Sequence, residues 1–396
     1  MAVVKIDPDR AGMDPGRLAQ IDRHLTERYL TPGKLAGCQV LVARHGHVAY
    51  LGSFGYRDRE RQLPADESTI WRLYSMTKPV TGVALLTLYE QAHFHLDDPV
   101  HRFIPAWRDL KVREVGEYGQ VRLVEPDRPM TVRHLMMHMA GLGYSLSNRD
   151  LETDRLRQAP GTRMGEGMSL AAMTDRLAEA PLRYHPGQRW LYSLATDVCG
   201  RLVEVISGQR FDDYLRDTVF GPLGMTDTGF WVPPEQAQRL AASYERDGSK
   251  QLVVLDDPAH SPFLEPPAFL SGGAGLVGTI GDYGRFCQML LNGGELDGAR
   301  ILSRKTVELM RSNHLPGGRE MADFANPGGY GEVGFEGMGF GLTVAVASEP
   351  TRTGVVGSAG EFMWGGAAST LFWVDPAEDL LAVFMTQLVP SGTFNF

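Results

Sequence analysis

The sequence predicts an α/β protein of the α+β type, in which helices flank an antiparallel sheet. Two β-rich runs around a His45-Gly46 turn indicate a hairpin near the N-terminus. Helical patterns fill the middle, and β-like runs with short spacings, typical of antiparallel pairing, close the chain. We therefore expect a sheet domain from residues 1–85 and 265–396, a mainly helical domain from residues 86–264, and a functional site in the cleft between them.

Helix caps, apolar spacing and β-rich runs place the elements along the chain. Asp14, Thr131 and Ser169 suit the caps of three helices, and hairpin strands are expected at residues 38–43 and 48–51. Residues 75–91 are apolar on most sides, which indicates a buried helix. Further helices are expected at residues 132–139, 170–178, 197–206, 211–219 and 280–291, strands at 341–347, 354–359, 368–374 and 380–387, and irregular stretches lining the site at 143–167, 232–270 and 316–339.

Composition narrows the possible functions. The 396 residues carry a net charge of −9 without a basic run, which argues against a nucleic-acid partner. No apolar stretch is long enough to span a membrane, and Asp7 and Asp9 interrupt the place of a signal peptide, so we expect a cytoplasmic protein. The widely spaced Cys38, Cys199 and Cys287 are expected to be buried apolar side chains, without disulfide or metal cluster.

A serine and a lysine stand one helical turn apart where a loop enters the buried helix. Residues three apart share a helix face, so Ser75 at the helix start places its hydroxyl beside the Lys78 amine. The helix N-terminus adds free N–H groups, and an acyl-transfer nucleophile needs both a base and such donors for its oxyanion. The same residues also fit a serine cap beside a lysine that reaches solvent, and the local pattern does not separate the two interpretations.

Lys78 can act as a base only if its pKa is lowered. At an ordinary pKa near 10.4, the neutral amine costs about 4–5 kcal/mol at pH 7, and burial reduces that cost. A nearby tyrosine offers a second route, because a Lys–Tyr pair acts as one coupled base. Tyr192, ahead of the expected 197–206 helix, is a candidate, although alone it also fits an ordinary packed aromatic side chain.

Five motifs, in order along the chain, resemble those of the serine β-lactamase and penicillin-binding-protein superfamily. They are residues 75–78 (SMTK), 96–100 (LDDPV), 131–138 (TVRHLMMH), 187–193 (GQRWLYS) and 222–225 (PLGM). The resemblance covers about residues 10–390 and is strongest to class C β-lactamases and family VIII carboxylesterases. It implies a β-lactamase/transpeptidase-like fold and a hydrolase that acts on small molecules without cofactor or metal.

The resemblance also implies roles for individual residues. Ser75 would be the nucleophile, with Lys78 and Tyr192 as the proton-transfer pair. The family's third element, usually Lys-Thr-Gly on an edge strand, matches the segment that begins at Trp364 and ends at Ala367. The amides of Ser75 and Ala367 would form the oxyanion hole, and the substrate-binding residues would be Trp364, Gly365, Gly366, Ser193 and Leu194.

Two departures from the family pattern favour esters as substrates. β-Lactamases and peptidases usually carry Asn two residues after the tyrosine, where this chain has Leu194, and Lys where it has Trp364. Both lost groups hold the polar amide and carboxylate of a penicillin or peptide, whereas an apolar Trp suits an uncharged ester. The alternatives are a β-lactamase or D-amino-acid peptidase, and an inactive member that binds peptidoglycan or a protein.

Two other hydrolase classes fit less well. No serine of the chain stands in a Gly-x-Ser-x-Gly motif, which argues against an α/β-hydrolase. His134 and His138 are spaced four apart but lack the glutamate of a metalloprotease helix, so a structural role is expected for them.

Overall fold

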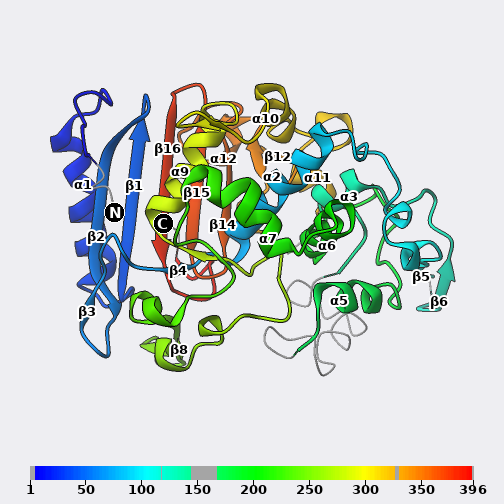
Figure 1. Cartoon of the computed structure of the whole chain (residues 1–396), viewed down its shortest axis with the longest axis horizontal. Helices are drawn as coiled ribbons and strands as arrows, with labels where there is room; N and C mark the ends of the chain where they lie inside the picture. The colour runs from blue at the N-terminus through cyan, green and yellow to red at the C-terminus, as the bar shows by residue number, and fades with distance from the viewer. Residues whose placement is uncertain (1–4, 117, 144–166, 326–329, 395–396) are drawn as a thin grey trace.

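An eight-stranded antiparallel sheet joins the two ends of the chain in the computed structural model, which describes residues 5–116, 118–143, 167–325 and 330–394. Its strands are β1 (Gly37–Arg44), β2 (His47–Asp58), β3 (Leu63–Pro64), β12 (Met338–Phe340), β13 (Ala345–Ala347), β14 (Phe362–Gly366), β15 (Thr370–Asp375) and β16 (Leu380–Thr386). They are ordered β12-β13-β14-β15-β16-β1-β2-β3. Figure 1 shows the N-terminal β1 beside the C-terminal β16. The prediction of a sheet built from both chain ends is confirmed.

The hairpin at the N-terminal side of the sheet follows from its turn residues. His45 and Gly46 both adopt positive φ, 55° and 71°. Two such residues in succession make the tight turn whose twist matches that of paired strands. The expected hairpin is therefore confirmed, and β2 extends beyond the predicted strand to Asp58.

Shorter strands among the described residues form four separate two-stranded ribbons. They pair β4 (Trp71–Arg72) with β9 (Val277–Gly278), β5 (Val112–Val115) with β6 (Val121–Val124), β7 (Ser243–Arg246) with β8 (Leu252–Asp256), and β10 (Glu295–Leu296) with β11 (Ala299–Arg300). The β7–β8 ribbon lies against the main sheet, because the Tyr244 amide donates to the Gln387 carbonyl at 2.8 Å.

Helices cover the sheet and fill the middle of the chain. They are α1 (Pro15–Leu25), α2 (Thr77–Glu90), α3 (Val132–Met136), α5 (Leu170–Leu177), α6 (Ala195–Ser207), α7 (Phe211–Leu215), α8 (Gly221–Leu223), α9 (Ile280–Leu291), α10 (Arg304–Met310), α11 (Met321–Phe324) and α12 (Pro350–Thr353). α9 packs on β1, β15 and β16, while α2 packs on α6 and α7. The predicted caps are present: Asp14 accepts from the Arg17 amide, and Thr131 and Ser169 cap α3 and α5 in the same way.

Several predicted boundaries are wrong. Residues 354–359 are not a strand: Gly354 ends α12 with φ 72°, and Val355 and Val356 are 71% and 102% exposed, so their β propensity has no partner strand to act on. The strand is β14, one segment later, and β15 begins at Thr370 after a turn. The helix predicted at 132–139 ends at Met136, because His138 takes φ 56°.

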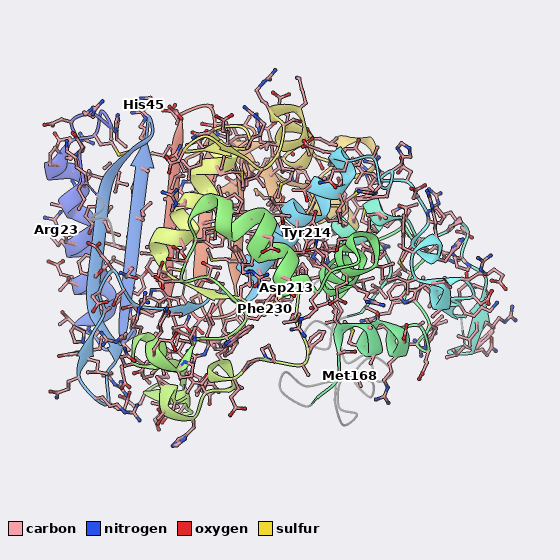
Figure 2. The ribbon with its side chains drawn as sticks, in the orientation of Figure 1. Arg23, His45, Met168, Asp213, Tyr214 and Phe230 are labelled. Carbon is pink, nitrogen blue, oxygen red and sulfur yellow. The ribbon has the colours of Figure 1, made fainter. Side chains whose placement is uncertain are left out.

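A continuous apolar core runs from the sheet through α2 and α9 into the helical part. In Figure 2, Arg23 and His45 mark the sheet side of the molecule, and Met168, just before α5, marks the helical side. Cys38, Cys199 and Cys287 are fully buried and unpaired, as expected. Among the described residues, no helix has the length and hydropathy to cross a membrane.

Candidate active site

Ser75 and Lys78 lie where the chain turns into α2. Tyr74–Met76 forms a short 3₁₀ turn directly ahead of this helix. Here the Lys78 Nζ donates to the Ser75 Oγ at 3.1 Å. Both side chains are buried, with 5% of Ser75 and 1% of Lys78 exposed. Spacing three residues apart thus brings the hydroxyl and the amine into direct contact.

The turn that carries Ser75 is held from two sides. Tyr74 adopts φ 44°, a conformation that a non-glycine residue keeps only when its surroundings enforce it. The Leu73 amide donates to the Leu276 carbonyl at 2.9 Å, and the Tyr283 hydroxyl of α9 donates to the Met76 carbonyl at 2.9 Å. Hydrogen bonds on both sides of Ser75 therefore fix the backbone that carries its hydroxyl.

Burial changes the chemistry of Lys78. Desolvation lowers the pKa of its ammonium to about 8, although the carboxylates of Asp197 and Glu332 act to raise it. At a pKa of about 8, roughly a tenth of the amine is neutral at pH 7. The Nζ also donates to the Gly273 carbonyl at 2.7 Å, which fixes the direction of the amine. The solvent-reaching lysine of the alternative interpretation is excluded.

Asp197 on α6 holds the segment that receives this hydrogen bond. Its Oδ1 accepts from the Ser271 Oγ at 2.6 Å and from the Gly273 amide at 3.0 Å. Asp197 therefore fixes the carbonyl that orients Lys78, in addition to acting on its charge.

Tyr192 lies beside the same amine. The centre of its ring is 4.5 Å from the Lys78 Nζ, and 2% of the residue is exposed. The loop that carries it is attached to His138, whose carbonyl accepts from the Leu191 amide at 2.8 Å. The Ser75 hydroxyl and the Tyr192 ring therefore both lie close to the Lys78 Nζ.

The segment from Trp364 to Gly366 forms the end of β14, against the turn that carries Ser75. The expectation of an edge strand is wrong for β14 as a whole, since β13 separates it from β12. β13, however, pairs only with Phe362 and Met363, so the last three residues pair on one side alone, with β15. They form a local edge, because β13 is too short to cover them.

Packing explains two residues of this segment. A Cβ at Gly366 would lie 2.4 Å from the Leu73 carbonyl oxygen, so only glycine lets the strand approach the turn. Trp364 is fully buried, with its ring 5.5 Å from that of Tyr192 and 5.4 Å from that of Phe340. Ala367, itself half-buried, follows in the turn before β15.

The two predicted residues after Tyr192 face different surroundings. The hydroxyl of Ser193 is buried beside the His138 Nδ1 at 3.2 Å and accepts from the Ala195 amide at 3.3 Å. Leu194 caps α6 and packs, half-buried, against the main core.

Sequence reasoning missed four residues of this site: His138, Asp197, Gly273 and Glu332. His138 was expected to be structural, yet it adjoins Tyr192, with ring centres 5.0 Å apart. Burial, together with the charge of Lys78, holds the pKa of His138 well below its ordinary value, so it is neutral. No spacing links the other three to Ser75, because segments distant in the chain meet only in the fold.

A family model described as Beta-lactamase matches residues 23–395. The chain belongs to the beta-lactamase family. The resemblance read from the five motifs is confirmed, and so is the predicted fold.

This chain is similar over almost its whole length to proteins described as an esterase, a hydrolase and a synthase. Esterase EstB from Burkholderia gladioli is 32% identical over 99% of this chain and 96% of its own length. The structure of EstCE1, a hydrolase with promiscuous acyltransferase activity, superposes with a TM-score of 0.79 at 29% identity and covers 94% of both chains. Simvastatin synthase (LovD) from Aspergillus terreus superposes with a TM-score of 0.77 at 25% identity, over 95% of this chain and 94% of its own.

Proposed function

We propose that this protein is a serine carboxylesterase that cleaves short-chain esters through an acyl-enzyme on Ser75. The observation that carries the proposal is the 3.1 Å contact between the Ser75 hydroxyl and a fully buried amine whose pKa is lowered to about 8. A nucleophile in contact with a base that is partly neutral near pH 7 is what acyl transfer requires. The similarity to EstB and EstCE1, both described as ester-cleaving or hydrolytic proteins, supports this choice.

The reaction would proceed in two balanced halves. The Ser75 Oγ bonds to the ester carbonyl carbon while its proton passes to the Lys78–Tyr192 pair. The amides of Ser75 and Ala367 hold the oxyanion, and the alcohol leaves with the proton as the C–O bond breaks. Water then bonds to the acyl carbon and gives a proton to the same pair. As the bond between that carbon and the Ser75 Oγ breaks, the pair returns the proton to Oγ, which releases the acid and restores the Ser75 hydroxyl.

The strand end and the loop after Tyr192 would form the walls of the substrate site. Trp364, Gly365 and Gly366 would bound one side, with Ser193 and Leu194 behind the other. This site would lie between the sheet domain (residues 1–85 and 265–396) and the helical domain (residues 86–264). The unpaired buried cysteines support the cytoplasm as its compartment.

A direct test compares ester and β-lactam turnover. Wild-type protein is assayed with short 4-nitrophenyl esters and with a chromogenic cephalosporin, beside Ser75→Ala and the exposed control Ser312→Ala. We expect ester turnover in wild type and in Ser312→Ala, and a loss of about four orders of magnitude or more in Ser75→Ala. Near-native activity of Ser75→Ala would refute the mechanism.

The same assay decides between the alternatives. Cephalosporin turnover at comparable efficiency would indicate a β-lactamase or D-amino-acid peptidase. Silence with both substrate classes would indicate an inactive member that binds peptidoglycan or a protein.

A further inference from the structure

A short segment ahead of β12 crosses the candidate site and brings a carboxylate to it. The ring of Tyr330 lies 5.7 Å from that of Tyr192. A Cβ at Gly331 would lie 3.5 Å from the Trp190 ring, and a Cβ at Gly365 would lie 3.3 Å from that of Glu332. Three successive residues therefore touch the tyrosine loop on one side and the β14 strand end on the other.

The carboxylate of Glu332 is held in place by a chain of hydroxyls. The Ser391 Oγ donates to the Glu332 Oε2 at 2.8 Å, and the Tyr330 hydroxyl lies 2.9 Å from the Ser391 Oγ. Because the single Ser391 proton goes to Glu332, the Tyr330 hydroxyl donates to Ser391. These two hydroxyls orient the carboxylate and bring no positive charge to it.

The carboxylate of Glu332 forms no direct ion pair with a cation in the part of the chain that the structure describes. None of the ion pairs among those residues includes Glu332, whereas Glu336, four residues on, pairs with Arg352 at 2.6 Å. Glu332 is near enough to Lys78 for its negative charge to raise the pKa of the ammonium, as the charge of Asp197 also does. The site thus combines two carboxylates with one amine that must lose its charge to act.

We propose that Glu332 is a specificity-determining residue that makes the enzyme discriminate against carboxylate-bearing substrates and favour neutral or cationic esters. The inference rests on the proposed esterase function and names its substrate class. A substrate carboxylate near Glu332 would face like-charge repulsion in a partly desolvated site, which costs about tenfold or more in kcat/KM. A cationic group there would be attracted by the same charge and by the aromatic ring of Tyr330.

Matched esters test this directly. One series consists of 4-nitrophenyl esters whose acyl chains have the same length and end in a methyl, carboxylate or trimethylammonium group. In a second series of esters the acyl group is constant, and the alcohol carries the same three terminal groups. In wild type we expect the carboxylate ester of at least one series to react about tenfold or more slowly than the methyl ester. The difference in rate between the carboxylate and methyl esters should become smaller as salt is added, because salt screens the repulsion.

Glu332→Gln keeps the size and the hydrogen-bond acceptor while removing the charge. We expect it to narrow the methyl-to-carboxylate ratio about tenfold and to reduce any preference for the trimethylammonium ester. The control Glu336→Gln, in an exposed ion pair, should leave both ratios as in wild type. Each ratio compares kcat/KM for two esters on the same variant. A change in the base strength of Lys78 or in overall folding affects both esters alike, so it would leave the ratio unchanged.

The two proposals fail in different ways. If no ester shows turnover that depends on Ser75, both the esterase function and this substrate class are overturned. If Ser75-dependent turnover is present but Glu332→Gln leaves the ratios unchanged in both series, the inference alone is wrong.

Discussion

The nucleophile turn and the wall opposite it are built in different ways. Ser75 and Lys78 belong to one helical turn, so backbone geometry sets their 3.1 Å contact. Tyr192, Trp364 and Glu332 come from three segments far apart in the chain, and they meet through loops and a strand end. The contact between hydroxyl and amine should therefore survive changes in the wall, whereas base strength and substrate choice should not.

Removing the Tyr192 hydroxyl tests this difference most strongly. We expect Tyr192→Phe to slow acylation by about two to four orders of magnitude, because the pair loses one of its proton-transfer groups while the ring still packs. Pre-steady-state release of 4-nitrophenol measures this step. The control Tyr118→Phe, 85% exposed, should react like wild type. Acylation at a near-native rate in Tyr192→Phe would show that the helical turn suffices alone.

The pH dependence of kcat/KM tests how a carboxylate from a distant segment, Asp197 on α6, tunes the pKa of Lys78. Activity on a neutral ester should rise with pH through about 8, because the Lys78 pair must lose its proton and the pKa of Lys78 is lowered to about 8. Asp197→Asn keeps an oxygen acceptor for Gly273 but removes a charge that favours the ammonium. The pKa of Lys78 should then fall further, and the rising limb should move to lower pH.

A surface carboxylate provides the control for that measurement. Asp217→Asn changes an exposed partner of Arg216 and should leave the limb where it is. If the rising limb of the pH profile of kcat/KM stays in place or moves to higher pH in Asp197→Asn, the electrostatic account is wrong.

The smallest expected effect concerns the packing that holds α2. A Cβ at Gly82 would lie 2.1 Å from the Thr343 Oγ1, so Gly82→Ala should lower the free energy of unfolding by about 1–3 kcal/mol despite better helix propensity. Gly281 on α9 has its nearest atom at 4.0 Å, so Gly281→Ala should be neutral or stabilise by up to about 1 kcal/mol. Urea denaturation followed by circular dichroism measures both, and equal effects would refute the packing argument.

Prediction from the sequence succeeded where the signal is local. The caps at Asp14, Thr131 and Ser169 were found because a capping side chain acts within three residues. The helix at Ile280–Leu291 was placed within its observed bounds because its apolar spacing is regular. The strand predicted at 341–347 begins only at Ala345, and the one predicted at 354–359 is absent, because β propensity does not say whether a partner strand lies alongside.

The candidate site divides in the same way. The order of its motifs identified the family, since each motif is contiguous in the chain. Gly273, Asp197 and Glu332 escaped notice because a carbonyl or a carboxylate carries no sequence signal for the lysine that it will face.

The amino-acid order by itself determined the fold family, because each of its motifs is contiguous in the chain. It also determined the caps and the contact of Ser75 with Lys78, because these depend on neighbours one helical turn away. Only the tertiary structure decided the burial that lowers the pKa of Lys78, the local edge at the end of β14 and the approach of Glu332 to it. Desolvation and charge act through space, and which groups share that space is settled only when the sheet and the helices pack.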